Sequence, residues 1–199
     1  MAKQTASQTV GPYFAYCLTE AERYGGRDIA SNVLAADGTL GHRIRIEGRV
    51  LDGAGKPVPD AMIEIWQANA VGRYDHPEDT RAQAALDPSF KGFGRAGTDA
   101  NGRFFFDTVK PGALPGTGWA QQAPHVNVIV FARGMLVHAY TRLYFADDHE
   151  ANAADPVLAS IPERRRGTLI AERRQSDGRV AYRLDIRLQG EYETVFFDV

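Results

Sequence analysis

The sequence offers few side chains in arrangements typical of known catalytic chemistry. Its five histidines are His42, His76, His125, His138 and His149, and no two of them are spaced as metal ligands on one helix. The chain has no nucleophile-elbow serine, no phosphate-cradling glycine loop and no HExxH motif. The chemistry, if the chain takes part in any, must therefore come from a more specialised set of residues.

Four segments carry such a specialised pattern. They are 48–52 with 56–61, 65–69 with 72–74, 98–99 with 102–104 and 109–112, and 124–128. In this order they resemble the intradiol dioxygenase family over most of the chain. The most specific part is Trp66-Gln67-Ala68-Asn69 followed by Gly72-Arg73-Tyr74. The Gly/Asp turn motifs are weaker, because many small β-sandwich binding modules share them.

The resemblance implies a ferric iron, Fe(III), held by two tyrosines and a His-x-His pair, and anionic oxygen ligands suit such a hard trivalent ion. Tyr74 and His125 match one tyrosine and the first histidine. Leu114 and Asn127 stand where the second tyrosine and second histidine are expected, and Gln122 replaces a nearby arginine. We therefore predict vestigial metal-site positions, no bound metal, and no catalytic residue on this chain. Tyr74 and His125 are expected to be packed, hydrogen-bonded residues.

The resemblance also implies a homologous beta subunit that binds the iron. Alpha–beta protomers in a higher oligomer would bind a carboxylated catechol and O2 at a shared site, and would insert both oxygen atoms between its hydroxylated carbons. Arg133 is predicted to place a guanidinium near the substrate carboxylate, with which arginine forms paired hydrogen bonds. Gly11, Pro12 and Tyr13 are predicted to form a wall of that pocket, because glycine permits close backbone approach and proline fixes the path.

Two other functions stay open. One is a self-sufficient dioxygenase that builds an altered metal site from Tyr74, His125 and further groups. The other is a non-catalytic β-sandwich module that binds carbohydrate or protein. Iron content of the chain expressed alone distinguishes the first, and co-purification with a chain that has an intact His-x-His pair distinguishes the second.

Strand patterns dominate the elements that must position these residues. Residues 43–50 alternate between apolar and charged side chains, as a half-buried strand does. Further strands are expected at 62–67, 103–109, 125–132, 135–145 and 181–189, with Arg133-Gly134 as a two-residue hairpin connection. Asp155 and Pro156 predict the N-cap and first residue of a short helix. The pattern favours an all-β sandwich with long loops and a few short helices.

Composition is that of a globular protein, with 44% apolar and 24% charged residues among 199. We expect one domain, 1–199, with an N-terminal arm and loops at 1–40 and a sandwich core at 41–199. The formal net charge of -2 gives no basis for binding nucleic acid or an anionic membrane. Cys17 is the single cysteine, and neither a signal-like pattern nor a bilayer-length apolar run is present, so a cytoplasmic location is expected. The charge run 163–166 is expected to be solvated or at a subunit interface.

Overall fold

Two β-layers form the body of the molecule. The computed structural model describes residues 18–19, 30–116, 118, 120–176 and 178–198. The first layer consists of β1 (Arg43–Leu51), β4 (Arg103–Val109), β10 (Arg179–Arg183) and β11 (Ile186–Arg187). The second consists of β2 (Met62–Trp66), β3 (Phe93–Gly97), β7 (His125–Phe131) and β8 (Ala139–Phe145). This arrangement confirms the expected β-sandwich.

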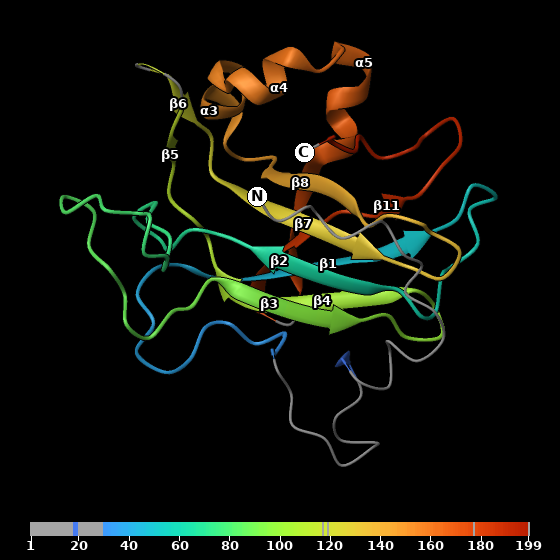
Figure 1. The fold of residues 1–199 in the computed structure, drawn as a ribbon, viewed down its shortest axis with the longest axis horizontal. Helices are drawn as coiled ribbons and strands as arrows, with labels where there is room; N and C mark the ends of the chain where they lie inside the picture. Colours follow the sequence, from blue (N-terminus) through green and yellow to red (C-terminus); the bar gives the residue numbers. More distant parts are fainter. Residues whose placement is uncertain (1–17, 20–29, 117, 119, 177, 199) are drawn as a thin grey trace, which may run out of the picture.

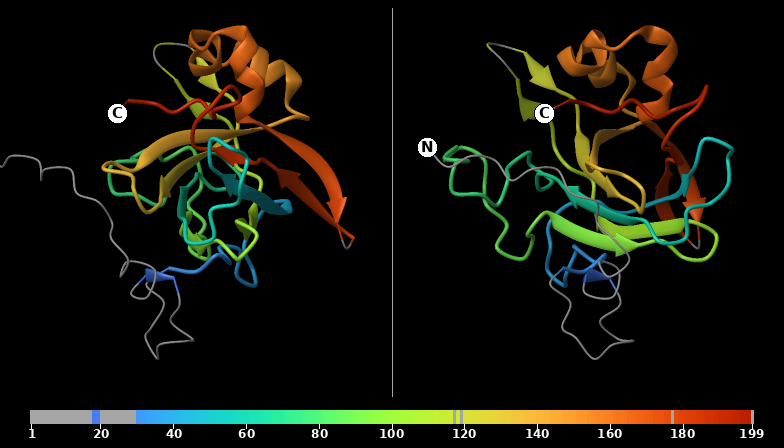
Figure 2. Two further views of the ribbon diagram at one scale, coloured as in Figure 1. Left: turned by 90° about the vertical axis from the view of Figure 1, so that its right-hand side faces the viewer. Right: turned by 45° about the vertical axis from the view of Figure 1, so that its right-hand side comes forward.

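A single strand, β9 (Ile170–Ser176), belongs to both layers. Its first residues pair in parallel with β8, at Tyr144↔Ile170, and its remainder pairs antiparallel with β10. In Figure 2, β9 and β10 run from below the helices to the far edge of the molecule. The two layers therefore form one continuous strand order, β11-β1-β10-β9-β8-β7-β2-β3, with β4 paired to β1.

The core lies between the layers because the strands alternate as a pleated chain must. In β1 the even-numbered residues Ile44, Ile46 and Val50 are buried, as the sequence pattern predicts. In β7 the even-numbered valines face the same core, which leaves His125 and Asn127 on the outer face of the second layer. That outer face is where the polar site described below is built.

A helical cap covers one end of the sandwich (Figure 1). It contains α3 (His149–Ala154), α4 (Pro156–Ser160), α5 (Glu163–Arg166) and the 3-10 helix η1 (Gly167–Leu169). Beside it lies a two-stranded ribbon of β5 (Leu114–Pro115) and β6 (Gln121–Gln122). Within the described residues, no helix combines the length and the apolar character needed to cross a bilayer.

The carboxylate of Asp155, which is fully buried, fastens this cap to the sheet. Its Oδ1 accepts the backbone N–H groups of Val157 and Leu158, each at 2.8 Å, and this confirms the predicted N-cap of α4. Its Oδ2 accepts the N–H of Ala123 at 2.8 Å, two residues before His125. The hydroxyl of Tyr144 in β8 also donates to Oδ1, at 3.3 Å. One side chain thus fixes the cap, β8 and the start of β7.

Two of the predicted strands, 135–145 and 181–189, are shorter in the structure than expected. β8 begins at Ala139, so a loop of residues 132–138 replaces the expected two-residue connection. In this loop the backbone N–H of Met135 donates to the carbonyl of Ala132 at 3.3 Å, and this turn ends the extended backbone of β7. The expected strand 181–189 is interrupted after Arg183, and Asp185 instead accepts the Arg49 guanidinium at 2.7 Å. The alternation of apolar and polar residues continues through both stretches of sequence, but the backbone pairing of the strand does not.

The charge run 163–166 forms α5 and hydrogen-bonds within its own chain. Arg165 Nη2 donates to the carbonyl of Glu193 at 3.1 Å, and Arg166 Nε donates to the carbonyl of Ile161 at 2.9 Å. These two arginines are half-buried, and the expectation that the run is solvated or lies at a subunit interface stays a prediction. Arg164, between Glu163 and Arg165, is exposed.

Replacing Asp155 tests its role as the fastener of the cap. Asp155→Ala leaves three backbone N–H groups without their acceptor, and we expect a loss of about 3 kcal/mol in the free energy of unfolding. Asp155→Asn keeps one acceptor oxygen and should lose less. Denaturant unfolding at pH 7 measures both. A loss below about 1 kcal/mol for the alanine variant would contradict the assignment, because it would equal the loss of an ordinary single hydrogen bond.

Candidate functional site

The segment after β2 is held by the side chain of Gln67, which is fully buried. Its amide Nε2 donates to the carbonyls of Ala68, at 3.1 Å, and Val109, at 2.9 Å. Its Oε1 accepts the hydroxyl of Thr108 at 2.8 Å. Because Thr108 and Val109 end β4, this one amide ties the second layer to the first at the end of the sandwich where the site lies.

Asn69 and Gly72 shape the turn that follows. Asn69 Oδ1 accepts the N–H groups of Val71, at 3.1 Å, and Arg73, at 2.9 Å. Gly72 has φ +77°, and a Cβ there would lie 2.0 Å from the carbonyl oxygen of Ala113. Only glycine tolerates both conditions. The turn therefore brings the segment before Tyr74 against the segment before Leu114.

Tyr74 is fixed on both sides by its neighbours. Its backbone N–H donates to Asp79 Oδ2 at 2.8 Å, and its ring stacks on Trp66 with 5.5 Å between centroids and 13° between planes. Arg81 Nε donates to Asp79 Oδ1 at 2.7 Å, and this pairing holds the pKa of the Asp79 carboxyl well below its usual range. The Asp79 charge is thus neutralised locally by Arg81.

His125 and Asn127 point to the same outer face of β7, two residues apart. His125 is 1% exposed, and its Nδ1 lies 2.8 Å from the carbonyl oxygen of Ala123, so the neutral ring donates from Nδ1 and keeps Nε2 as an acceptor. Asn127 Nδ2 donates to the hydroxyl of Tyr74 at 3.1 Å. The two neighbours of Asn127 in the sheet are Trp66 in β2 and Arg142 in β8.

Arg142 supplies a cation that the sequence interpretation considered lost. Its Nη1 donates to Gln122 Oε1 at 2.8 Å and to the Tyr144 hydroxyl at 3.3 Å. Gln122 stands where the resemblance placed an arginine, and the Arg142 guanidinium lies beside it. The charge comes from the adjacent strand and contacts Gln122 directly.

These residues line one cavity of about 510 Å³, named here the Tyr74–Arg142 cavity. Its walls include Trp66, Tyr74, Leu114, Gln122, His125 and Arg142. Asn127 contacts it through its hydrogen bond to Tyr74. All four positions that the resemblance assigned to a metal site therefore lie together, although they come from three separate parts of the chain.

Burial and the Arg142 charge set the protonation states in the cavity. Burial, together with a smaller effect of the positive charge of Arg142, lowers the pKa of His125 to about 4. Burial raises the pKa of the Tyr74 hydroxyl above its ordinary value. It also raises the pKa of Tyr144 to about 12. At neutral pH the inner wall of the cavity thus carries the neutral imidazole of His125, the neutral phenol of Tyr74 and the guanidinium of Arg142.

This donor set does not fit a ferric ion. A phenolate at Tyr74 is disfavoured by burial, and the Tyr74 oxygen already accepts an amide N–H. Leu114 has no donor atom, and the amide of Asn127 turns its N–H toward Tyr74. The guanidinium of Arg142 would repel a trivalent cation. Two neutral donors beside a positive charge give little affinity for a hard, highly charged metal.

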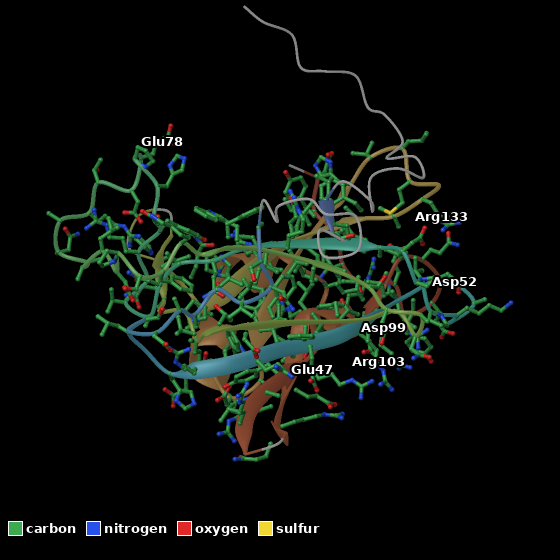
Figure 3. The ribbon with its side chains drawn as sticks, turned by 90° about the horizontal axis from the view of Figure 1, so that it is seen from below. Glu47, Asp52, Glu78, Asp99, Arg103 and Arg133 are labelled. Atoms are coloured by element: carbon green, nitrogen blue, oxygen red, sulfur yellow. The ribbon has the colours of Figure 1, made fainter. Side chains whose placement is uncertain are left out.

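Arg133 lies far from this cavity, in the loop 132–138 at the opposite end of β7 from His125. Figure 3 labels Arg133 and the cavity residue Glu78 on opposite sides of the molecule. The Arg133 side chain is 74% exposed, and its Nε forms an ion pair with Asp60. Arg133 therefore does not line the Tyr74–Arg142 cavity. Gly11, Pro12 and Tyr13 fall outside the described residues.

Comparison with known proteins agrees with this fold and site. A family profile described as dioxygenase matches residues 11–190. The chain is 48% identical over 201 aligned residues to the protocatechuate 3,4-dioxygenase alpha chain of Burkholderia cepacia, which covers 99% of this chain and 98% of that protein. It is 39% identical to the beta chain of the same enzyme and organism, over 84% of this chain and 73% of that protein.

A solved structure extends the likeness to the fold. An intradiol ring-cleavage dioxygenase from Tetranychus urticae superposes with a TM-score of 0.60 at 20% identity, over 94% of each chain. The same sandwich thus persists where most residues differ. With the family profile spanning most of its length and a relative near half identity, the chain belongs to the intradiol dioxygenase family.

Proposed function

We propose that this chain is the non-iron-binding alpha subunit of a protocatechuate 3,4-dioxygenase. The observation that carries the proposal is the likeness to an alpha chain over nearly the full length of both proteins. With a homologous beta subunit it would cleave protocatechuate by inserting O2 between the two hydroxylated carbons, giving 3-carboxy-cis,cis-muconate for the beta-ketoadipate pathway. We place the complex in the cytoplasm, in keeping with the single cysteine of this chain.

The proposed division of labour follows from the donor set. The beta subunit would bind Fe(III) and supply the oxygen chemistry, whereas Tyr74, Leu114, His125 and Asn127 are vestigial metal-site positions on this chain. The mismatch of Leu114 and Asn127 with iron, and the Arg142 charge beside them, support this assignment. They also count against a self-sufficient dioxygenase. The full-length likeness to one enzyme subunit counts against an unrelated binding module.

We further propose that Arg133 reaches the partner's site and receives the substrate carboxylate, with Gly11, Pro12 and Tyr13 forming a wall of the same pocket. The exposure of Arg133 supports its contact with another chain. Leu136 and Val137 in the same loop are 71% and 58% exposed, which is typical of a surface that a partner covers. The ion pair with Asp60 orients the Arg133 side chain on its own subunit.

Iron content tests the proposed division of labour. The chain expressed alone should contain no stoichiometric iron and should lack the visible phenolate-to-iron charge-transfer band. The double variant Leu114→Tyr with Asn127→His restores both missing donors and should bind more iron than the unchanged chain. Metal analysis and visible absorption measure this. Stoichiometric iron in the unchanged chain would contradict a vestigial site.

Substitution of Arg133 tests its role toward substrate. A charged hydrogen bond is worth roughly 1.5–3 kcal/mol, so Arg133→Ala should raise the protocatechuate KM about ten- to a hundredfold. Arg133→Lys should recover only part of the loss, because a point charge cannot form the planar paired contact. Steady-state kinetics of the reconstituted complex measure this at constant iron content.

Catechol is the internal control for Arg133, since it has no carboxylate. Its turnover should hardly change in Arg133→Ala. Asp60→Asn keeps the guanidinium but removes its ion-pair partner, so it should have a smaller effect than Arg133→Ala. Equal damage with both substrates, or an unchanged protocatechuate KM, would make Arg133 a loop or interface residue only.

The structural role of His125 predicts a pH dependence of stability. Because its pKa is about 4 when folded, the unfolded chain binds a proton first as the pH falls below about 6.5. The contribution of neutral His125 is thus complete above pH 6.5 and is lost as the pH falls toward 4. The loss is at most about 3.5 kcal/mol, at roughly 1.4 kcal/mol per pH unit of the window.

The measurement compares the chain with its His125→Gln variant by denaturant unfolding from pH 7 to pH 4. Glutamine does not titrate, so the difference in unfolding free energy isolates His125 from the other ionisable groups. As the pH falls, we expect the unfolding free energy of the unsubstituted chain to decrease relative to that of His125→Gln. A constant difference across this window would show that His125 is not held neutral by burial.

A further inference from the structure

Arg142 differs from the other charged residues that line the Tyr74–Arg142 cavity. Arg81 pairs with Asp79, and Glu78 is exposed and projects outward at the rim (Figure 3). Across the part of the chain that the structure describes, no carboxylate lies within ion-pair distance of Arg142. Among the charged residues that line the cavity, Arg142 is therefore the cation with no ion-pair partner in the described residues, and the carboxylate of Asp155 lies beyond the Tyr144 hydroxyl.

The Arg142 side chain is also held in place for a ligand. Its Nη1 is fixed by Gln122 and by Tyr144, and Tyr144 donates in turn to the buried Asp155. Its Nε and Nη2 donate no hydrogen bond to any described residue. These two atoms form one edge of the guanidinium, which is the edge that binds a carboxylate through two parallel hydrogen bonds.

The rest of the cavity is shaped for a flat apolar body with a polar edge. The stacked rings of Trp66 and Tyr74 form one wall, and Leu114 and Pro115 add apolar surface. The Tyr74 hydroxyl accepts from Asn127 and keeps its own proton for donation. A volume of about 510 Å³ lies within the usual range of small-molecule sites.

We propose that the Tyr74–Arg142 cavity binds a single-ring aromatic carboxylate, with Arg142 as the carboxylate receptor, and that it does so without metal. The ligand ring would lie against the aromatic and apolar walls. The proposal rests on residues of this chain alone, and it stands whether or not the chain functions as an alpha subunit.

The test uses 4-fluorobenzoate as the probe, observed by fluorine NMR titration of the full chain with any co-purifying subunit retained. Arg142→Gln should weaken the binding of 4-fluorobenzoate to the Tyr74–Arg142 cavity about ten- to a hundredfold, which is the usual contribution of a charged hydrogen bond. Arg164→Gln, which removes an exposed arginine from α5, is the matched control and should change affinity less than about twofold. Binding of 4-fluorobenzoate at a partner's iron site would not change in Arg142→Gln, so the variant distinguishes it from binding in the cavity.

Ligand chemistry is tested on the unsubstituted chain, so this arm does not depend on the variant folding. The neutral analogue 4-fluorobenzamide should bind at least about tenfold more weakly than 4-fluorobenzoate, because it lacks the charge that Arg142 receives. Inorganic phosphate in tenfold excess should not displace the probe. Absence of Arg142-dependent binding at millimolar probe, or equal binding of the amide, would overturn the proposal. Displacement by phosphate would overturn its aromatic part and leave a general anion site.

Discussion

The buried amide of Gln67 is the interaction on which the rest of the site depends. It is the polar link between the end of β2 and the end of β4, and it satisfies backbone carbonyls of both. An amide buried without these partners would cost free energy comparable to a lost hydrogen bond, so the two layers meet at this end in one register. The turn of Asn69 and Gly72 then starts from a fixed point and reaches the segment before Leu114.

In this chain, most residues that form the frame of the cavity are different from those at the expected metal-site positions. Gln67, Asn69, Gly72 and the Trp66–Tyr74 stack form the frame that holds the cavity open, and none of them requires a metal. In the proposed assignment, Leu114 and Asn127 stand at metal-site positions without supplying iron ligands, and the frame does not depend on donors there. In the binding site proposed here, the Arg142 charge favours an anion over a cation, because a guanidinium pairs with a negative group.

The two ends of β7 serve different neighbours. At its start, His125 and Asn127 face the cavity of their own chain, under the helical cap that Asp155 fastens. At its end, the loop 132–138 presents Arg133 with exposed Leu136 and Val137 to the outside. A rigid strand thus connects an inward-facing pocket with an outward-facing loop, and a residue at one end has no direct contact with a ligand at the other.

Sequence by itself determined the elements with strong local signals: the alternation in β1, the bounds of β4, the cap at Asp155, and the mapping of Tyr74, Leu114, His125 and Asn127 through linear motifs. Only the tertiary structure placed Arg142 opposite Asn127 and within reach of Gln122, because the register of β8 against β7 is a pairing between distant segments that no local pattern encodes. The same reason explains the missed start of β8 and the interruption after Arg183. Hydrophobic alternation depends on which face is buried, whereas strand limits depend on where a partner backbone offers hydrogen bonds.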